Sequence, residues 1–271
     1  MSTAVVTLTD QNYFERAKRT IVDCRTRGEW KGPIILITIA FDAPKNWLDF
    51  YGVTGKRFEH IDTSSLVEQY KLHPFVTPHD GRNLSKLTQW DKFHVFDEYF
   101  LQWKKVIFLD AGLGVFDSIQ HLNELECDGK LIAPDDAPPY DEKKRFFLML
   151  EFGANAEAEK RLFEEYSRDI LQERYFLNCM WVYDTQLIKK CAVSDLVSAM
   201  NKFPICRCNE MTIMNLLFSY KHKVWSPMPQ FASSGKRLFG WCEYDRDYGT
   251  ANTWRDFCFM KYPVSINMNR E

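Results

Sequence analysis

The chain has 271 residues, of which 45% are hydrophobic and 15% aromatic, and its formal net charge is −2. This length and composition suffice for one large α/β domain with a substantial core. No block of like charge stands out, so the sequence gives no support for nucleic-acid binding or for binding to an acidic membrane surface.

Targeting signals are not evident either. No apolar stretch approaches the length of a transmembrane segment, and no basic segment followed by an apolar one opens the chain as in a secretory signal. The eight cysteines are widely spread, which favours free thiols in a reducing compartment over disulfides. We therefore expect a cytoplasmic protein. Cys206 and Cys208 form the one close pair, a weak metal signal without a second pair or nearby histidines.

The first half of the chain predicts strands alternating with helices. Residues 4–8 and 33–39 are apolar runs without polar alternation, typical of strands buried on both faces. Residues 12–27 between them have helical spacing, so the three segments predict a βαβ unit with a parallel sheet. We expect a short third strand at residues 58–61 and a helix from residue 84 to about 103.

The next apolar run, residues 106–109, ends abruptly at Asp110, which is followed by Ala111 and Gly112. A carboxylate at the carboxyl end of a buried strand lies where open α/β sheets place their ligands. Glycine there lets another group approach the backbone closely. A strand followed by a capped turn explains these residues equally well when they are taken alone.

Two interpretations also remain open at the end of the first strand. Asp10 or Asn12 can cap the following helix. Alternatively, Thr9, Asp10 and Tyr13 hold a nucleotide at the carboxyl edge of the sheet, with the Tyr13 ring stacked on the base.

The second half continues the same alternation. Residues 130–140 predict a short strand that runs into a proline-rich acidic loop, and Asn178 is the one uncharged polar residue of the next strand. The strand that contains Asn178 is expected at 174–184, after a helix at 157–171. We also expect helices at 187–200 and from 208, the latter with Asn209 as its cap, and a late strand or edge segment at 224–229. From residue 235 on, the sequence has little periodicity.

Five short motifs occur in a fixed order. They are S-K-L-T-Q-W from Ser85, L-D-A-G from Leu109, A-P-D from Ala133, F-L-N-C from Phe176 and N-E-M-T-I-M-N from Asn209. In this order they resemble the glycogenin-like enzymes of glycosyltransferase family 8, which carry T-K-L-x-x-W, L-D-A-D, A-x-P-D, F-N-S-G and G-D-Q-x-x-L-N. The resemblance spans residues 5–218.

The resemblance implies both a fold and an activity. The expected fold is a single GT-A domain over residues 1–271, an α/β fold with a mainly parallel central sheet. The expected reaction is transfer of a hexosyl or pentosyl group from a nucleotide-sugar, most simply a UDP-sugar, to a hydroxyl of a glycan or glycoprotein, with retention at the anomeric carbon.

The resemblance also implies roles for individual residues. Glu210 falls on the family's active-site aspartate, and Asp135 and Asn178 fall where side chains bind sugar hydroxyls. Of these, the two acids, Glu210 and Asp135, are the predicted catalytic residues. The predicted donor-binding residues are Leu8, Thr9, Asp10, Tyr13, Lys86, Asp110, Ala111, Gly112, Asn178 and Cys179.

The predicted cofactor is a divalent cation, manganese or magnesium, with Asp110 as its protein ligand. A departing diphosphate needs positive charge, which such a cation or lysine and arginine can supply. Gly112, however, replaces the second acid of the family's D-x-D motif. The family's carboxyl-terminal metal-binding histidine has no match either, since His222 is the last histidine. Three alternatives follow: metal binding is weak, it uses other ligands such as Asp117, or it is absent. Lys86 would contact the donor and could supply part of the positive charge.

Two other functions compete with sugar transfer. Loss of the second acid after Asp110 favours a non-catalytic relative that binds a nucleotide-sugar or a glycan. A nucleotidyltransferase would share the sheet type, but no G-x-G-rich phosphate loop follows the first strand, so it ranks last.

Overall fold

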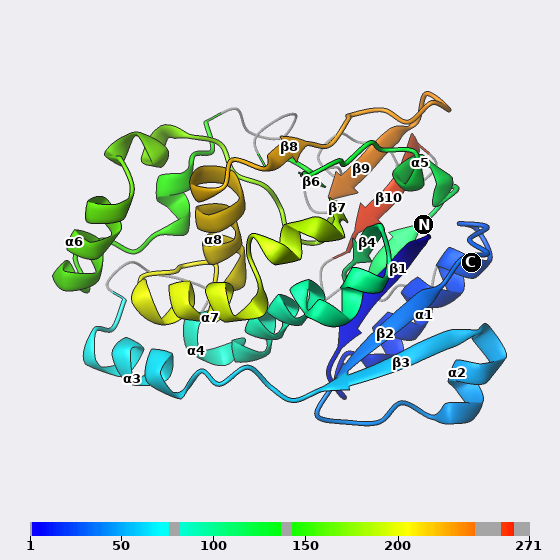
Figure 1. Cartoon of the computed structure of the whole chain (residues 1–271), viewed down its shortest axis with the longest axis horizontal. Helices are drawn as coiled ribbons and strands as arrows, with labels where there is room; N and C mark the ends of the chain where they lie inside the picture. The colour runs from blue at the N-terminus through cyan, green and yellow to red at the C-terminus, as the bar shows by residue number, and fades with distance from the viewer. Residues whose placement is uncertain (1, 76–81, 137–142, 242–255, 263–271) are drawn as a thin grey trace.

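The computed structural model describes residues 2–75, 82–136, 143–241 and 256–262. A seven-stranded sheet in the order β3-β2-β1-β4-β7-β6-β8 forms the centre of the molecule (Figure 1). Its strands are β1 (Thr3–Thr9), β2 (Ile34–Ile39), β3 (Val53–Phe58), β4 (Lys105–Leu109), β6 (Leu131–Ala133), β7 (Met180–Asp184) and β8 (Trp225–Pro227).

The strand directions decide which residues meet at one edge of this sheet. β1 runs parallel to β2 and β4, while β7 runs antiparallel to both β4 and β6. Met180 at the start of β7 pairs with Leu109 at the end of β4. The amino end of β7 therefore lies beside the carboxyl ends of β1 and β4. The predicted α/β fold with a mainly parallel central sheet is confirmed.

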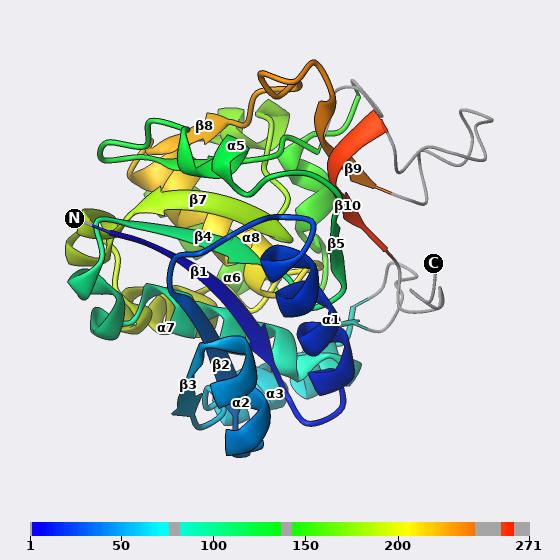
Figure 2. The ribbon, with the colours of Figure 1, turned by 90° about the vertical axis from the view of Figure 1, so that its right-hand side faces the viewer.

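A second sheet of three strands, in the order β5-β10-β9, packs beside the first (Figure 2). Its members are β5 (Leu113–Val115), β9 (Arg237–Trp241) and β10 (Phe257–Lys261). β10 is antiparallel to β5, and Lys261 lies opposite Leu113. Because β5 follows directly after the turn at Asp110, this pairing places the end of β10 near the end of β4.

Helical segments connect the strands. The α-helices are α1 (Phe14–Arg25), α2 (Lys45–Tyr51), α3 (Ser64–Leu72), α4 (Arg82–Ser85), α5 (Gln120–Asn123), α6 (Ala156–Glu165), α7 (Val193–Lys202) and α8 (Glu210–Met214). The 3₁₀ segments are η1 (Leu87–Phe96), η2 (Glu98–Gln102), η3 (Phe146–Met149), η4 (Arg168–Gln172) and η5 (Thr185–Lys189), and η6 (Asn215–Lys221) is a π-helix. Among the described residues, no helix combines the length and apolar character needed to cross a membrane.

The inner strands of the central sheet, β1, β2, β4, β6 and β7, are buried on both faces, whereas the edge strands β3 and β8 are partly exposed. Successive residues of a strand point to opposite sides, so Val5 and Ile107 join one core while Val6 and Phe108 join the other. α1 and the second sheet cover the first face, whereas η1, α7 and α8 cover the second. Double coverage explains why the sequences of β1, β2 and β4 are almost continuously apolar rather than alternating.

Several predicted element bounds were wrong. β3 ends at Phe58, where the third strand was expected to begin. The helix expected over 84–103 is instead α4 followed by η1 and η2. Leu87, Trp90, Phe93 and Phe96 are three residues apart, which is the period of a 3₁₀-helix rather than an α-helix. The strand expected over 174–184 is reduced to β7.

Candidate functional site

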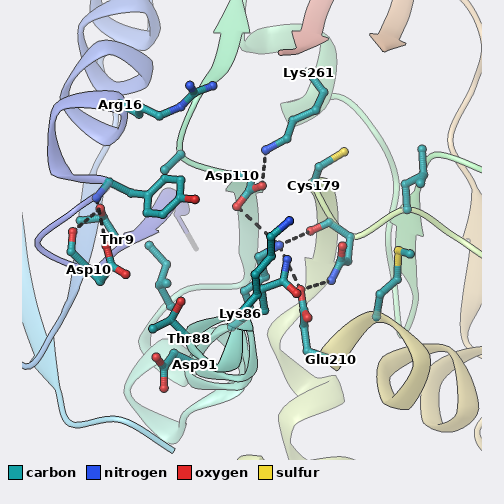
Figure 3. Close-up of a pocket in the computed structure, with 18 of the residues that line it drawn as sticks. Thr9, Asp10, Arg16, Lys86, Thr88, Asp91, Asp110, Cys179, Glu210 and Lys261 are labelled. Carbon is teal, nitrogen blue, oxygen red and sulfur yellow. Dashed lines mark hydrogen bonds and ion pairs between the residues drawn. The ribbon is translucent and has the colours of Figure 1, made fainter. Parts of the chain in front are cut away.

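A pocket of about 500 Å³ lies at the edge where β1 and β4 end and β7 begins (Figure 3). The fold thus brings together most of the residues singled out from the sequence. Those that line the pocket are Leu8, Thr9, Asp10, Tyr13, Lys86, Asp110, Ala111, Asn178, Cys179 and Glu210. Gly112 and Asp135, the other two predicted site residues, do not line it.

Asp10 closes the turn between β1 and α1. Its Oδ1 accepts a hydrogen bond of 2.9 Å from the backbone N–H of Tyr13, and the Thr9 hydroxyl donates to the Asp10 carbonyl at 2.8 Å. Tyr13, rather than Asp10 or Asn12, occupies the N-cap position of α1. This turn presents Thr9, Asp10 and Tyr13 to the same pocket, and nucleotide binding by them stays a prediction.

The Asp110 carboxylate is held between two lysine ammonium groups. Its Oδ1 is 3.5 Å from Lys92 Nζ, and its Oδ2 is ion-paired with Lys261 Nζ (Figure 3). Burial acts to raise the pKa of Asp110, but Lys261 and Lys92 outweigh it and hold this pKa below the usual range. Asp110 is therefore an anion that binds two protein cations. Its backbone N–H donates to the Cys179 carbonyl at 2.9 Å, which fastens the end of β4 to the segment before β7.

Glu210, the first residue of α8, is 2% exposed. Its Oε1 accepts a hydrogen bond of 2.7 Å from Asn178 Nδ2 and lies 3.2 Å from Lys92 Nζ. Its Oε2 is buried and has no hydrogen-bond partner within the described ranges. Burial raises the pKa of Glu210, although Lys92 and Asn178 oppose this shift. An unsatisfied buried acceptor is costly, and a hydroxyl group that reached Oε2 would remove this cost.

Asn178 and Cys179 reach the pocket from the segment that precedes β7. Asn178 is 8% exposed and is positioned by its bond to Glu210. Burial raises the pKa of Cys179 to about 12, so the side chain remains a neutral thiol at physiological pH. The predicted role of Asn178 in binding sugar hydroxyls stays a prediction, and the Cys179 thiol offers no charge to a donor.

Three basic residues of the pocket were not predicted: Lys92, Lys261 and Arg16. Burial acts to lower the pKa of Lys92, but the carboxylates of Asp110 and Glu210 raise it above the usual value. No local pattern marks Lys92, because it falls between Trp90 and Phe93 without interrupting the apolar spacing of η1. Lys261 closes the apolar run 257–260, which is short and lies in the otherwise aperiodic tail.

Gly112 lies against Arg16 rather than against the pocket. Its φ is +89°, and a Cβ at this position would be 2.6 Å from both Nε and Nη2 of Arg16. The Gly112 N–H donates to the Thr20 hydroxyl at 3.1 Å. The close approach expected at this glycine is therefore made by a guanidinium group of α1.

Asp135 lies outside the pocket lining. It forms an isolated β-bridge with Phe176, and its carboxylate is ion-paired with Arg174. Asp135 is thus paired with a protein cation outside the pocket lining, and its predicted contact with the sugar stays a prediction. The A-P-D motif begins at Ala133, the last residue of β6.

Asn209 joins α8 to the segment that carries Lys86. It occupies the N-cap position of α8 with φ +45°, yet its side chain makes no capping hydrogen bond. Its Nδ2 instead donates to the Lys86 carbonyl at 3.3 Å and to Gln89 Oε1 at 3.0 Å. These bonds fix Lys86 and Glu210 on neighbouring walls of the pocket.

The surroundings of Asp110 do not fit a divalent cation. Such ions take six or more oxygen ligands, whereas both Asp110 oxygens face ammonium groups and Gly112 has no side chain. Asp117, the alternative ligand considered above, lies elsewhere. Its carboxylate, His121 and Cys258 offer ligand atoms within 4.8 Å of one another. None of these three residues lines the pocket, and Lys236 Nζ is 2.9 Å from Asp117 Oδ2.

No protein-family model matches the chain, and no curated protein matches it. Solved structures do match. The galactosyltransferase LgtC in complex with donor and acceptor sugar analogs superposes with a TM-score of 0.61 at 14% identity, over 96% of this chain and 86% of that one. An active-site mutant of LgtC gives a TM-score of 0.60, with the same identity and coverage.

A third match is the bifunctional glycosyltransferase WbbM, with a TM-score of 0.57 at 12% identity. It covers 96% of this chain but only 45% of WbbM. At identities this low, the superpositions establish similarity of fold alone. At that level they confirm the resemblance that the five motifs indicated. The chain has the GT-A glycosyltransferase fold that it shares with LgtC.

Proposed function

We propose that this protein transfers a sugar from a nucleotide-diphosphate sugar to a hydroxyl group of an acceptor. The observation that carries this proposal is the Asn178–Glu210 pair in a pocket at the end of β4. In this pair the Oε2 of Glu210 is buried and has no hydrogen-bond partner among the described residues. A sugar ring is rich in hydroxyl donors, and a buried acceptor in a pocket is a site that one such donor can satisfy.

The pocket has a region suited to each part of the donor. Thr9, Asp10 and Tyr13 at the end of β1 would hold the nucleoside, and Lys86 would contact the diphosphate. Asn178 and Glu210 on the opposite wall would bind the sugar. A volume of about 500 Å³ is within the range of small-molecule sites in proteins.

Glu210 is the proposed catalytic residue. Its carboxylate would stabilise the oxocarbenium-like charge that develops on the sugar or position the acceptor hydroxyl, as carboxylates do in glycosyl chemistry. Asn178 and Lys92 hold Oε1 and leave Oε2 for this task. Because Glu210 is 2% exposed and paired within the pocket, it is not simply a surface acid at the start of a helix.

The finer properties are also proposals. We infer that residues 1–271 act as a single domain, that the donor is a UDP-sugar, and that the hexosyl or pentosyl group passes with retention to a glycan or glycoprotein. These inferences depend on the family resemblance of the motifs, and the residues lining the pocket are compatible with them.

The test is a panel of nucleotide-sugars that varies the base and the sugar independently. Each is incubated with the protein, with and without simple glycoside acceptors, and NMR follows the products and their anomeric configuration. We expect one donor to be hydrolysed slowly and its sugar to be transferred with retained configuration. Binding without release or transfer of sugar would instead identify a non-catalytic nucleotide-sugar-binding protein.

Replacement of Asn178 tests the sugar region separately. Asn178→Ala should weaken binding of the nucleotide-sugar more than binding of the bare nucleotide diphosphate, because its amide donates to Glu210, the residue proposed to face the sugar. Calorimetry on both ligands measures the difference. An equal loss for the two ligands would contradict a role of Asn178 in binding the sugar.

A further inference from the structure

We propose that protein cations take the place of a divalent metal ion in this pocket: Lys92, Lys261 and Arg16, the basic cluster, bind the diphosphate of the ligand directly. This inference rests on the proposed function for the identity of its ligand. The three residues come from η1, β10 and α1, and all three line the pocket. Figure 3 shows Arg16 to the upper left of Asp110 and Lys261 to its upper right.

Asp110 has a different role in this arrangement from that of a metal ligand. With Lys92 Nζ at 3.5 Å from its Oδ1 and Lys261 ion-paired with its Oδ2, a cation that approached this carboxylate would meet an ammonium group at each oxygen. Asp110 is thus a positioning residue that holds two positive charges at the carboxyl end of β4. A divalent ion brought beside those ammonium groups would be repelled by both.

Gly112 supports the same conclusion from the other side of the turn. An acid at this position could provide a second ligand oxygen, but the space its Cβ would occupy is 2.6 Å from the Arg16 guanidinium. Arg16 Nη2 also donates to the Tyr262 carbonyl at 3.3 Å, which ties it to the residue following Lys261. A third cation is therefore fixed next to the site where a second carboxylate would stand.

The charges around Asp110 favour a diphosphate over a cation. Lys92 and Lys261 pair with this carboxylate, Arg16 lines the same pocket, and the neighbouring acid, Glu210, is shared between Lys92 and Asn178. Lysine and arginine bind phosphate oxygens through charge-assisted hydrogen bonds. Preorganised cations can also stabilise the charge of a departing diphosphate, which is the role that a metal ion otherwise has.

The first experiment measures ligand binding to the full chain with and without metal. Inorganic pyrophosphate, UDP, GDP and ADP are titrated by calorimetry in EDTA and again with manganese or magnesium. We expect pyrophosphate and one nucleotide to bind in EDTA, with affinities within about threefold of those in metal, since the protein supplies the charge. Binding that weakens about tenfold or more in EDTA would overturn the inference and leave the proposed function standing.

The second experiment removes one cation. Lys261→Met should weaken pyrophosphate binding in EDTA about tenfold or more, as expected for loss of a charge-assisted contact. Lys261→Arg should retain most of the affinity. Lys236→Met is the matched control, because Lys236 pairs with Asp117 outside the pocket and should leave binding unchanged.

The effect of manganese on the Lys261→Met variant distinguishes a ligand-binding lysine from a purely structural one. Once Lys261 no longer neutralises Asp110, manganese should regain access to the carboxylate and restore part of the affinity of Lys261→Met. Unchanged pyrophosphate binding by a folded Lys261→Met variant would overturn the inference. Failure of pyrophosphate and of every nucleotide to bind, with or without metal, would overturn both this inference and the proposed function.

Discussion

Glu210 is the residue on which the proposed chemistry depends most. Glu210→Gln keeps the size of the side chain and the bond from Asn178 but removes the charge. We expect donor turnover to fall about a hundredfold with donor affinity nearly unchanged, as for an interaction made mainly in the transition state. Turnover and binding are measured separately, by product formation and by calorimetry.

The control for this substitution is Glu164→Gln. Glu164 is an exposed residue of α6 that pairs loosely with Lys160 at 3.9 Å, so its replacement should change neither quantity. Near-normal turnover in Glu210→Gln with a lowered melting temperature would show that Glu210 serves the fold and not the reaction.

Gly112 tests whether the departure from D-x-D is built into the structure. Gly112→Asp restores the family's second acid, but it places a side chain at φ +89° and against Arg16. We expect the free energy of unfolding to fall by about 2 kcal/mol or more. Urea denaturation measures this change.

A pair of alanine variants separates the two causes of that loss. Gly129 also has positive φ, at +63°, but a Cβ added there would meet no atom of the described residues within 4 Å. Gly129→Ala should therefore report backbone strain alone, and Gly112→Ala should cost more because of Arg16. Equal losses in the two variants would mean that Arg16 yields easily and does not exclude a side chain.

At the scale of elements, the ion pair between Asp110 and Lys261 joins the end of β4 to the end of β10, and so joins the two sheets. Asp110→Asn leaves Lys92 and Lys261 without their shared anion, and we expect the free energy of unfolding to fall by about 3 kcal/mol at neutral pH. Asp117→Asn is the comparison, since its partner Lys236 is more exposed than Lys261 and the loss should be smaller.

The pH dependence of this loss has a defined sign. The pKa of Asp110 is lower in the folded state than its ordinary value because of Lys261 and Lys92. Its contribution to stability is then present above the unfolded pKa of about 4 and disappears as the pH falls through the folded pKa. The difference in unfolding free energy between wild type and Asp110→Asn should narrow below about pH 4. A difference that stays constant down to about pH 2 would contradict the ion-pair assignment.

For the whole molecule, a ligand that binds the folded chain must raise its melting temperature. At a concentration about a hundredfold above Kd, the stabilisation is about 2.7 kcal/mol, which corresponds to a shift of about 5–10 °C for a chain of this size. We expect this shift with a nucleoside diphosphate in EDTA, and a smaller one with the corresponding monophosphate. Equal shifts for the two nucleotides would mean that the basic cluster does not contact the second phosphate.

Much of the central fold could be predicted from local sequence patterns. β1, β2 and β4 are continuous apolar runs, and their order with α1 indicates parallel pairing whatever the rest of the chain does. The same patterns place Asp10 and Asp110 at strand ends, and thus at one edge of the sheet. η1 was predicted as an α-helix because apolar residues three apart satisfy both helical periods over a short span.

The chemistry at that edge was decided by the tertiary structure. Asp110 and Lys261 are 151 residues apart, and only the pairing of β10 with β5 brings them together. Sequence alone determined that a carboxylate ends β4 and that Gly112 follows where the resembled family has a second acid. Whether that carboxylate meets a metal ion or lysines depends on long-range packing, which no local periodicity records. The contacts of Asp110 with Lys92 and Lys261, and of Gly112 with Arg16, come from that packing.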